Sequence, residues 1–386
     1  MESRLQPIPV DIVSQILSRL PIKSLHRFKS VCKTWFSLLS DPKFCLSSER
    51  DGVVVWSWSK FTQRSFSLHS MDDNASVKEL RTPWKEKSSS ISIWGSCNGF
   101  LLVLSGRDLF LWNPSTGYYR KMLAYHHFLI SMPYRITTGL CYDSSTDDYK
   151  AVIGIAYPGG RAVDDGGIFV LVGSFKINVL RRIHFPYNTR SVHRGPVVNG
   201  QLHWSISKSD TNFSASNLII YFDPLKDEFK ELPIPHRGEN LIFGLGVLGG
   251  CLCMVRWDNE NNYIEVLAMR EYGVKESWTT MFFISNLKLY PPWERLEPLC
   301  FTRDGEILML IVHAFSNKIL AYNPKEGSHR IFATSLIDDR RADVATYVES
   351  LVSPKPKIPL EYIVDGFVKI FRGLQMVGTR MKMKLL

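Results

Sequence analysis

A glycine-rich stretch is the first place in this sequence where residue types and spacing could support chemistry. Gly244, Gly246 and Gly249 fit the G-x-G-x-x-G pattern that binds a dinucleotide, and Glu265 stands about twenty residues further on, where an acid would bind the ribose. That pattern must open a helix, because the N–H groups of a helix N-terminus bind the phosphates. Residues 250–257 alternate in a β pattern instead, so we predict a strand here and no dinucleotide.

Histidine and cysteine residues that could bind a metal occur only in pairs. His126 and His127 are adjacent, so on a strand they would point to opposite faces, and no further histidine or carboxylate stands at ligand spacing. Cys251 and Cys253 would share one face of a strand, where two small apolar side chains in a core explain them more simply. We therefore expect no cofactor and no metal.

The signatures of common catalysts are missing as well. No G-x-S-x-G, H-E-x-x-H or P-loop occurs, and Asp147-Asp148 fits a turn better than an acid–base pair. The seven cysteines form an odd, scattered set without a C-x-x-C pair, which is typical of reduced thiols rather than of disulfides or structural zinc. We predict a protein that is not an enzyme.

The positive charge lies at the two ends of the chain. Of the formal net charge of +10, residues 1–50 carry +4 and residues 357–386 carry +4, which leaves +2 for the large middle part. A duplex-binding surface usually shows a concentrated basic face, so we expect no nucleic acid as a partner. The longest apolar run, residues 241–255, is shorter than the about twenty residues of a spanning helix, and no secretory signal opens the chain. We expect no membrane span and a location in the cytoplasm or nucleus.

From Val53 onward, short apolar runs rich in β-branched and aromatic residues indicate an all-β region. A glycine turn leads into an apolar strand at Asn98-Gly99, Asn199-Gly200, Gly249-Gly250 and Asp304-Gly305. An aromatic strand runs into Asn113-Pro114, Asp223-Pro224 and Asn323-Pro324. Each pair of such signals predicts one hairpin, because these turn residues favour positive φ or a fixed φ.

The glycine turns are spaced by one or two units of about fifty residues, which is the period of kelch-like blades with four strands each. We therefore predict a mainly β fold with a small α N-terminal module, in which three helices precede a kelch-like β-propeller of about six blades. A paired glycine precedes an obvious strand only at 249–250, so we allow for irregular blades. We expect most tryptophans in blade cores, namely Trp56, Trp94, Trp112, Trp204 and Trp278.

The N-terminal stretch has helical rather than β spacing. Apolar residues recur every three or four positions from Ile12 to Leu20 and from Leu25 to Leu39, with breaks at Pro21 and Asp41-Pro42. This pattern predicts three short helices. About forty residues are too few to bury a core of their own, so we expect another surface to cover part of the module.

This stretch resembles the F-box through Pro9, Ile16-Leu17, Leu20-Pro21, Leu25, Phe28, Val31-Cys32-Lys33 and Trp35. In that family the motif docks on the small adaptor subunit of a cullin-type ubiquitin ligase. The resemblance implies adaptor contacts, or their immediate supports, at Pro9, Ile12, Ile16, Leu17, Leu20, Pro21, Leu25, Phe28, Val31 and Trp35. Some of these residues must instead form the small core of the module.

The β region resembles the F-box-associated domain that is abundant in plant F-box proteins. The resemblance is carried by residues 97–102, 111–117, 142–143 with 147–150, and 347–351 in this order. In that family this domain recruits the substrate. We expect three parts: an F-box domain over 1–46, an F-box-associated propeller over 51–352, and a basic, partly amphipathic tail over 353–386.

The two resemblances together imply a substrate-recognition subunit of an SCF-type (cullin-RING) E3 ubiquitin ligase. The helices would bind the adaptor and through it a cullin, while the propeller would hold an unidentified target protein. The main alternative is a binding scaffold outside ubiquitin ligation, with the helices merely packed on the propeller. A propeller hydrolase or oxidase is a further alternative, and it would need acids, arginines or metal ligands clustered at strand starts, of which the sequence gives no sign.

Overall fold

The computed structural model describes most of the chain up to residue 352. The described residues are 9–39 without 19 and 21, residue 44, and 51–352 without 58–64, 71–76, 85–90, 123–134, 157–167, 188, 190–191, 208–216, 236–241, 259–262, 286, 288–293, 314–316 and 332–342. Three expectations therefore lie outside the described residues: the position of Pro21, the pair His126-His127 and the tail 353–386.

Three short helices form the N-terminal module, as the apolar spacing predicts. They are α1 (Val10–Ser18), α2 (Ile22–Phe28) and α3 (Lys33–Leu38). Asp11 lies in the first turn of α1, where a negative charge favours the positive end of the helix dipole. The Sγ atom of Cys32 accepts a hydrogen bond from the backbone N–H of Trp35 and so caps the N-terminus of α3.

The described strands form six antiparallel sheets of four strands each, and every sheet is one propeller blade. Blade 1 contains β24 (Asp343–Val348), β1 (Asp51–Ser57), β2 (Ser65–Ser70) and β3 (Val77–Leu80). Blade 2 contains β4 (Ile91–Cys97), β5 (Phe100–Ser105), β6 (Asp108–Trp112) and β7 (Tyr119–Met122). Blade 3 contains β8 (Arg135–Asp143), β9 (Asp148–Ala156), β10 (Ile168–Ser174) and β11 (Val179–Ile183).

The other three blades follow in chain order. Blade 4 contains β12 (Val192–Val198), β13 (Gln201–Ile206), β14 (Leu218–Asp223) and β15 (Glu228–Leu232). Blade 5 contains β16 (Ile242–Leu248), β17 (Cys251–Asp258), β18 (Tyr263–Met269) and β19 (Trp278–Ser285), with a 3-10 turn η2 (Lys275–Ser277) before β19. Blade 6 contains β20 (Glu294–Phe301), β21 (Ile307–His313), β22 (Lys318–Asn323) and β23 (Ser328–Ile331). Six blades agree with the predicted number, and each has its full set of strands.

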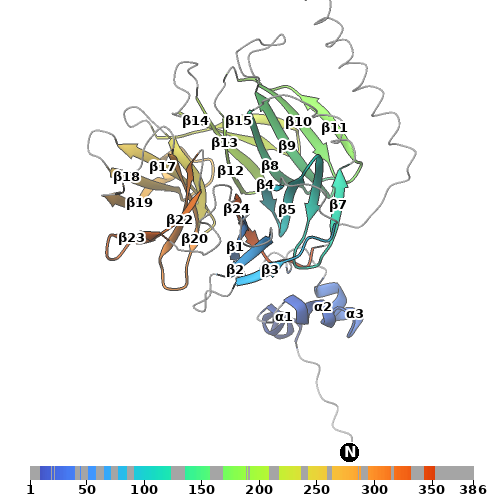
Figure 1. Ribbon diagram of the computed structural model, residues 1–386. Helices are drawn as coiled ribbons and strands as arrows, with labels where there is room; N and C mark the ends of the chain where they lie inside the picture. Colours follow the sequence, from blue (N-terminus) through green and yellow to red (C-terminus); the bar gives the residue numbers. More distant parts are fainter. Residues whose placement is uncertain are drawn as a thin grey trace, which may run out of the picture.

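The two ends of the propeller sequence meet in blade 1. Strand β24 pairs antiparallel with β1, so the last described strand completes the first sheet, and the two lie side by side in the ribbon (Figure 1). The inner strands β24, β4, β8, β12, β16 and β20 surround the axis and contact one another in turn. This pairing fastens the ring, because the first and the last described strands of the propeller share backbone hydrogen bonds within one blade.

The predicted glycine turns join the first strand of a blade to its second. Asn98 and Gly99 both have positive φ, as do Asn199-Gly200 and Gly249-Gly250, which is the geometry of a two-residue hairpin turn. At Asp304-Gly305 only the glycine has positive φ, and a longer loop joins β20 to β21. The G-x-G-x-x-G stretch is thus confirmed as strand β16 and its turn rather than the start of a helix.

Apolar side chains fill six cores, one between each pair of neighbouring blades. The buried tryptophans Trp94, Trp112, Trp204 and Trp278 lie in these cores, as predicted. The side chain of Trp56 is outside the described residues. Because each core takes residues from two sheets, a blade is stabilised mainly by its neighbours.

Candidate functional site

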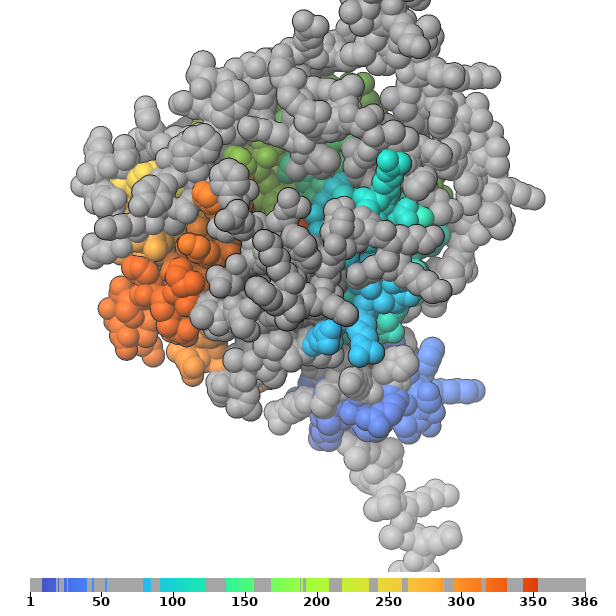
Figure 2. Space-filling view, viewed as in Figure 1, coloured from blue at the N-terminus to red at the C-terminus, as the bar shows by residue number. Residues whose placement is uncertain are grey.

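The helical module has a small core that includes one residue of the propeller side. Leu17, Leu25, Leu39 and Phe44 are buried together with Leu351, which follows the last strand β24. Val352 packs against the same core. The module therefore does not close its core alone, and the end of the propeller supplies part of it. In the space-filling view the module is a small lobe at the edge of the propeller (Figure 2).

A second set of apolar side chains on the module stays exposed. We call this set the apolar seam, and it consists of Val10, Ile12, Ile16, Val31 and Phe36, each about half exposed or more. These side chains remain exposed although the module is docked on the propeller. Five exposed large apolar side chains on so small a module favour a protein–protein interface.

The residues expected at the adaptor fall into three groups. Pro9, Ile12, Ile16 and Val31 are exposed, and the last three belong to the apolar seam. Leu20, Phe28 and Trp35 are half buried against the module core, and the rings of Phe28 and Trp35 pack edge to face at 5.3 Å. Leu17 and Leu25 are buried, so they can act only as supports.

Adaptor contact by these residues stays a prediction. Val10 and Phe36 were not expected at the adaptor, yet they are as exposed as Ile12, Ile16 and Val31. Helical periodicity gave no signal for Val10, because residues two positions apart, such as Val10 and Ile12, do not share a face of a helix.

A short segment holds the module to the propeller. We call Ser350, Leu351 and Val352 the joint, and Asn113 binds it from blade 2. The Nδ2 atom of Asn113 donates to the carbonyl oxygen of Ser350 at 3.1 Å and to that of Val352 at 3.0 Å. On the other side, Nζ of Lys29 lies 3.4 Å from the carbonyl oxygen of Leu351. The joint is thus bonded to both bodies.

Blade 2 is shaped to receive the joint. The hydroxyl of Ser350 donates to the carbonyl oxygen of Asn98 at 3.0 Å. At Gly99 a Cβ atom would overlap the Ser350 side chain, so only glycine fits this hairpin turn. The sequence showed Asn98-Gly99 and Asn113-Pro114 as turn signals, but it gave no sign that both turns also fix the position of the helices.

A buried ionic cluster joins blades 3 and 4. Nζ of Lys150 lies 2.8 Å from a carboxylate oxygen of Asp143 and 3.0 Å from one of Asp227, and it also donates to the carbonyl oxygen of Pro224 at 2.6 Å. Arg181 forms an ion pair with Asp227 from the outside. Burial alone would raise the pKa of Asp143, but hydrogen bonds from Lys150 and neighbouring hydroxyl and N–H groups hold it well below its usual value. This cluster is saturated and has a structural role.

A cavity of about 290 Å³ lies on the propeller axis and is lined by all six inner strands. Two charged side chains, Arg194 and Glu297, line this cavity. Arg295 pairs with Glu297 and Asp343 interacts with Arg194, and we call these four the channel charges. The sequence gave no sign of such a cluster, and the structure corrects that expectation. Its members come from three different blades and are far apart in the chain.

Backbone groups of Ile93 link two of the channel charges. Nη1 of Arg194 donates to the carbonyl oxygen of Ile93 at 3.1 Å, and the N–H of Ile93 donates to Oδ2 of Asp343 at 3.1 Å. Burial raises the pKa of Asp343, while the nearby Arg194 opposes this shift. Burial also lowers the pKa of Arg295, and Glu297 counteracts it.

The buried thiols of Cys97 and Cys253 show no features of metal ligands. Burial raises the pKa of both Cys97 and Cys253 to about 12, so each stays a protonated thiol near neutral pH. Cys253 packs in the core between blades 5 and 6, as predicted for this strand. Within the described ranges, no three His, Cys, Asp or Glu side chains are grouped so that they could hold a metal ion. No helix in the described part of the chain is long and apolar enough to span a bilayer.

Comparison with known proteins agrees with this two-part architecture. The model of the "F-box domain" family matches residues 5–47, and that of the "F-box associated beta propeller domain" family matches residues 52–354. The F-box protein CPR1 of Arabidopsis thaliana is 30% identical over 335 residues, covering 78% of this chain and 79% of that protein. An F-box/kelch-repeat protein of the same plant is 27% identical over 368 residues, covering 90% of this chain and 96% of that protein.

Among solved structures, TolB from Acinetobacter baumannii matches with a TM-score of 0.46 and 11% identity, covering 77% of this chain and 66% of that chain. A likeness at this level carries no functional argument. The family models and the plant relatives are decisive instead, because together they span both the helical module and the ring of blades. The chain therefore belongs to the F-box proteins that carry an F-box associated beta propeller domain.

Proposed function

We propose that this protein is a substrate receptor of an SCF-type ubiquitin ligase, which binds the adaptor through its helical module and a target protein through its propeller. The observation that carries the proposal is the apolar seam on a module that is fixed to the propeller by the joint. A partner that covers the seam removes these side chains from water, which gives about 25 cal/mol for each Å² of apolar surface buried.

In this role the chain makes no chemical bond. It holds a target lysine near a ubiquitin-charged enzyme, so that a rare encounter becomes a high local concentration. This mechanism needs a stiff connection, because a loose link spreads the target over a larger volume. The joint supplies such a connection through Asn113 on one side and Lys29 on the other.

The face that holds the target is proposed to be the one away from the module. Tight turns such as Asn98-Gly99 lie at the end of the inner strands that leads to the joint. The connections from the last strand of one blade to the inner strand of the next meet the described strands at the opposite end. Loops on a rigid scaffold are where binding residues concentrate.

The seam can be tested with two isoleucines of equal exposure. Ile16 in α1 and Ile331 at the end of β23 are both 52% exposed. We expect Ile16→Asp to abolish capture of the purified adaptor, since a charge in the middle of an interface costs roughly 2 kcal/mol or more. Ile331→Asp should capture the adaptor like the wild type.

Retention of the adaptor at wild-type strength by Ile16→Asp and by a second seam variant, Phe36→Asp, would contradict the docking proposal. That result would favour the scaffold alternative, in which the helices only pack on the propeller, and the burial of Leu351 in the module core is compatible with it. If the adaptor does bind through the seam, the target can be identified among the proteins that accumulate when the ligase is blocked.

A further inference from the structure

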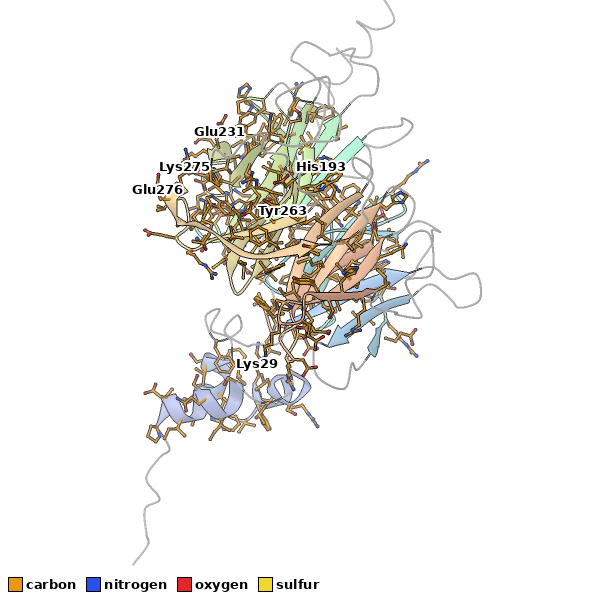
Figure 3. The ribbon with its side chains drawn as sticks, turned by 90° about the vertical axis from the view of Figure 1, so that its left-hand side faces the viewer. Lys29, His193, Glu231, Tyr263, Lys275 and Glu276 are labelled. Carbon is orange, nitrogen blue, oxygen red and sulfur yellow. The ribbon has the colours of Figure 1, made fainter. Side chains whose placement is uncertain are left out.

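The mouth of the central cavity, at the starts of the inner strands, carries charges that the proposed ligase role does not use. Arg194 and Glu297 line the cavity itself. His193, the neighbour of Arg194, lies in the part of the propeller away from Lys29 of the module (Figure 3). A volume of about 290 Å³ is close to the lower limit of pockets that take small ligands.

The guanidinium group of Arg194 reaches from its own blade to the next blade but one. It starts in β12 of blade 4 and reaches the carbonyl oxygen of Ile93 in blade 2 at 3.1 Å, past blade 3. This bond uses one of the five N–H donors of the group. The carboxylate of Asp343 in blade 1 attracts the guanidinium group of Arg194 electrostatically. Its hydrogen bond is made to the N–H of Ile93 instead.

Arg295 is held more loosely. Its Nη2 atom lies 3.7 Å from Oε1 of Glu297, which is longer than a hydrogen bond, and its side chain is only 20% exposed. Among the described residues this ion pair is its one polar contact. An enclosed guanidinium group with open donors loses the free energy of the hydrogen bonds that it does not make, and an oxyanion restores them best because its two oxygens match the planar fork.

We propose that this mouth binds a small oxyanion, a carboxylate or a phosphate group, between the guanidinium groups of Arg194 and Arg295. Glu297 and Asp343 balance charge in such a site. Two guanidinium groups in the interior repel each other, and the two carboxylates balance their charge while the site is empty. The site concerns a ligand of the propeller, so it stands even if the helical module binds no adaptor.

The test is a calorimetric titration of the full chain at constant ionic strength. Citrate serves as the carboxylate probe and inorganic phosphate as the phosphate probe, with chloride as the reference anion. We expect one or both probes to bind the wild type at one site, and the better probe shows which oxyanion the site prefers. Arg194→Gln and Arg295→Gln should each weaken binding by about tenfold or more, because a charged hydrogen-bond partner is lost.

The matched control is Arg330→Gln, which removes an exposed arginine that pairs with Glu306 on the same blade as Arg295. It should bind the probes like the wild type. If Arg295→Gln does not fold by circular dichroism, Arg295→Lys keeps the charge and loses the fork, and we expect it to fold and to bind at least about fivefold more weakly. Absence of binding to the wild type, or equal binding by the wild type and the Arg194 and Arg295 variants, would overturn the proposal.

Discussion

The helical module leaves its large apolar side chains exposed, whereas the propeller encloses most of its own in cores between blades. Five such residues are exposed between 9 and 39, against six in the whole described part of the propeller. The six of the propeller, which are Tyr119, Ile177, Leu225, Phe283, Phe301 and Ile331, lie on different blades or strands. The five of the module all belong to the one short body between residues 9 and 39. Isolated exposed hydrophobics are normal, while a cluster indicates a partner.

The difference follows from size. A ring of six sheets offers each blade two neighbours, so both faces of a sheet can be buried. Three helices of six to nine residues have too little volume to enclose their apolar face, even with Leu351 added to the core. We therefore expect substitutions in the propeller to act mainly on folding and substitutions on the module surface to act mainly on binding.

The largest effect is expected at the close approach of two inner strands. At Gly246 in β16 a Cβ atom would overlap the carbonyl oxygen of Pro298 in β20, and backbone atoms cannot move aside without breaking the ring. Gly246→Val should lower the free energy of unfolding by more than about 4 kcal/mol or prevent folding. Gly200→Ala is the control for loss of a glycine, because nothing lies near the Cβ position in this open turn. The control should lose stability only through its positive φ, which is strained for alanine. Thermal unfolding of both variants measures the difference.

The buried ion cluster comes next. Lys150→Met leaves the carboxylates of Asp143 and Asp227 without their cation, and we expect a loss of about 3–5 kcal/mol in stability. Lys121→Met, which removes a half-exposed pair with Asp108, should cost less than about 1 kcal/mol. Denaturant unfolding at pH 7 compares the two, and equal losses would show that the cluster does not lock the blades.

The same cluster predicts a dependence on pH. The folded pKa of Asp143 lies below its ordinary value of 3.8, so its contribution to stability is present above that value and is lost as the pH falls toward the folded pKa. The wild type should therefore lose stability on acidification below about pH 4. Asp143→Asn should flatten this part of the profile, and an unchanged acid limb would contradict the assignment.

A smaller effect is expected at the joint. Asn113→Asp keeps the oxygen that accepts from the N–H of Ser115 but loses the donors to Ser350 and Val352. Asn323→Asp is the matched control, because Asn323 caps the equivalent turn of blade 6 in the same way through the N–H of Lys325. We expect Asn113→Asp to cost about 1–3 kcal/mol and to speed hydrogen exchange in the helices, while the control does neither. Equal exchange in both variants would show that the module holds its place without Asn113.

The smallest effect on stability is expected in the apolar seam. Val31→Asp changes a side chain that is 59% exposed. The free energy of unfolding of the chain without its partner should therefore change by less than about 0.5 kcal/mol. In contrast, Leu25→Ala removes a buried side chain of the module core and should destabilise the module by about 2–5 kcal/mol. If Val31→Asp proved as destabilising as Leu25→Ala in chemical unfolding, the seam would be part of a core rather than a free surface.

Local features of the fold could be predicted because their causes are local. A turn such as Asn98-Gly99 adopts positive φ whatever surrounds it, and helical spacing from Ile12 to Leu20 defines one apolar face. Cys253 and Trp204 were assigned to cores from their strand context alone, and both are buried. The sequence could not show which of the expected adaptor residues are exposed and which are buried supports. That division depends on how the three helices pack on one another and on Leu351.

The sequence by itself determined the two-part order, the repeated hairpins, the approximate number of blades and the apolar character of the module. Only the tertiary structure decided that β24 completes the first blade, that Leu351 enters the core of the helices and that Arg194 interacts with Arg295 and Asp343 of other blades. The reason is chain separation: Ile93 and Asp343, which share a hydrogen bond, are 250 positions apart. Neighbours of that kind arise from the closure of the ring, and no pattern of nearby residues encodes them.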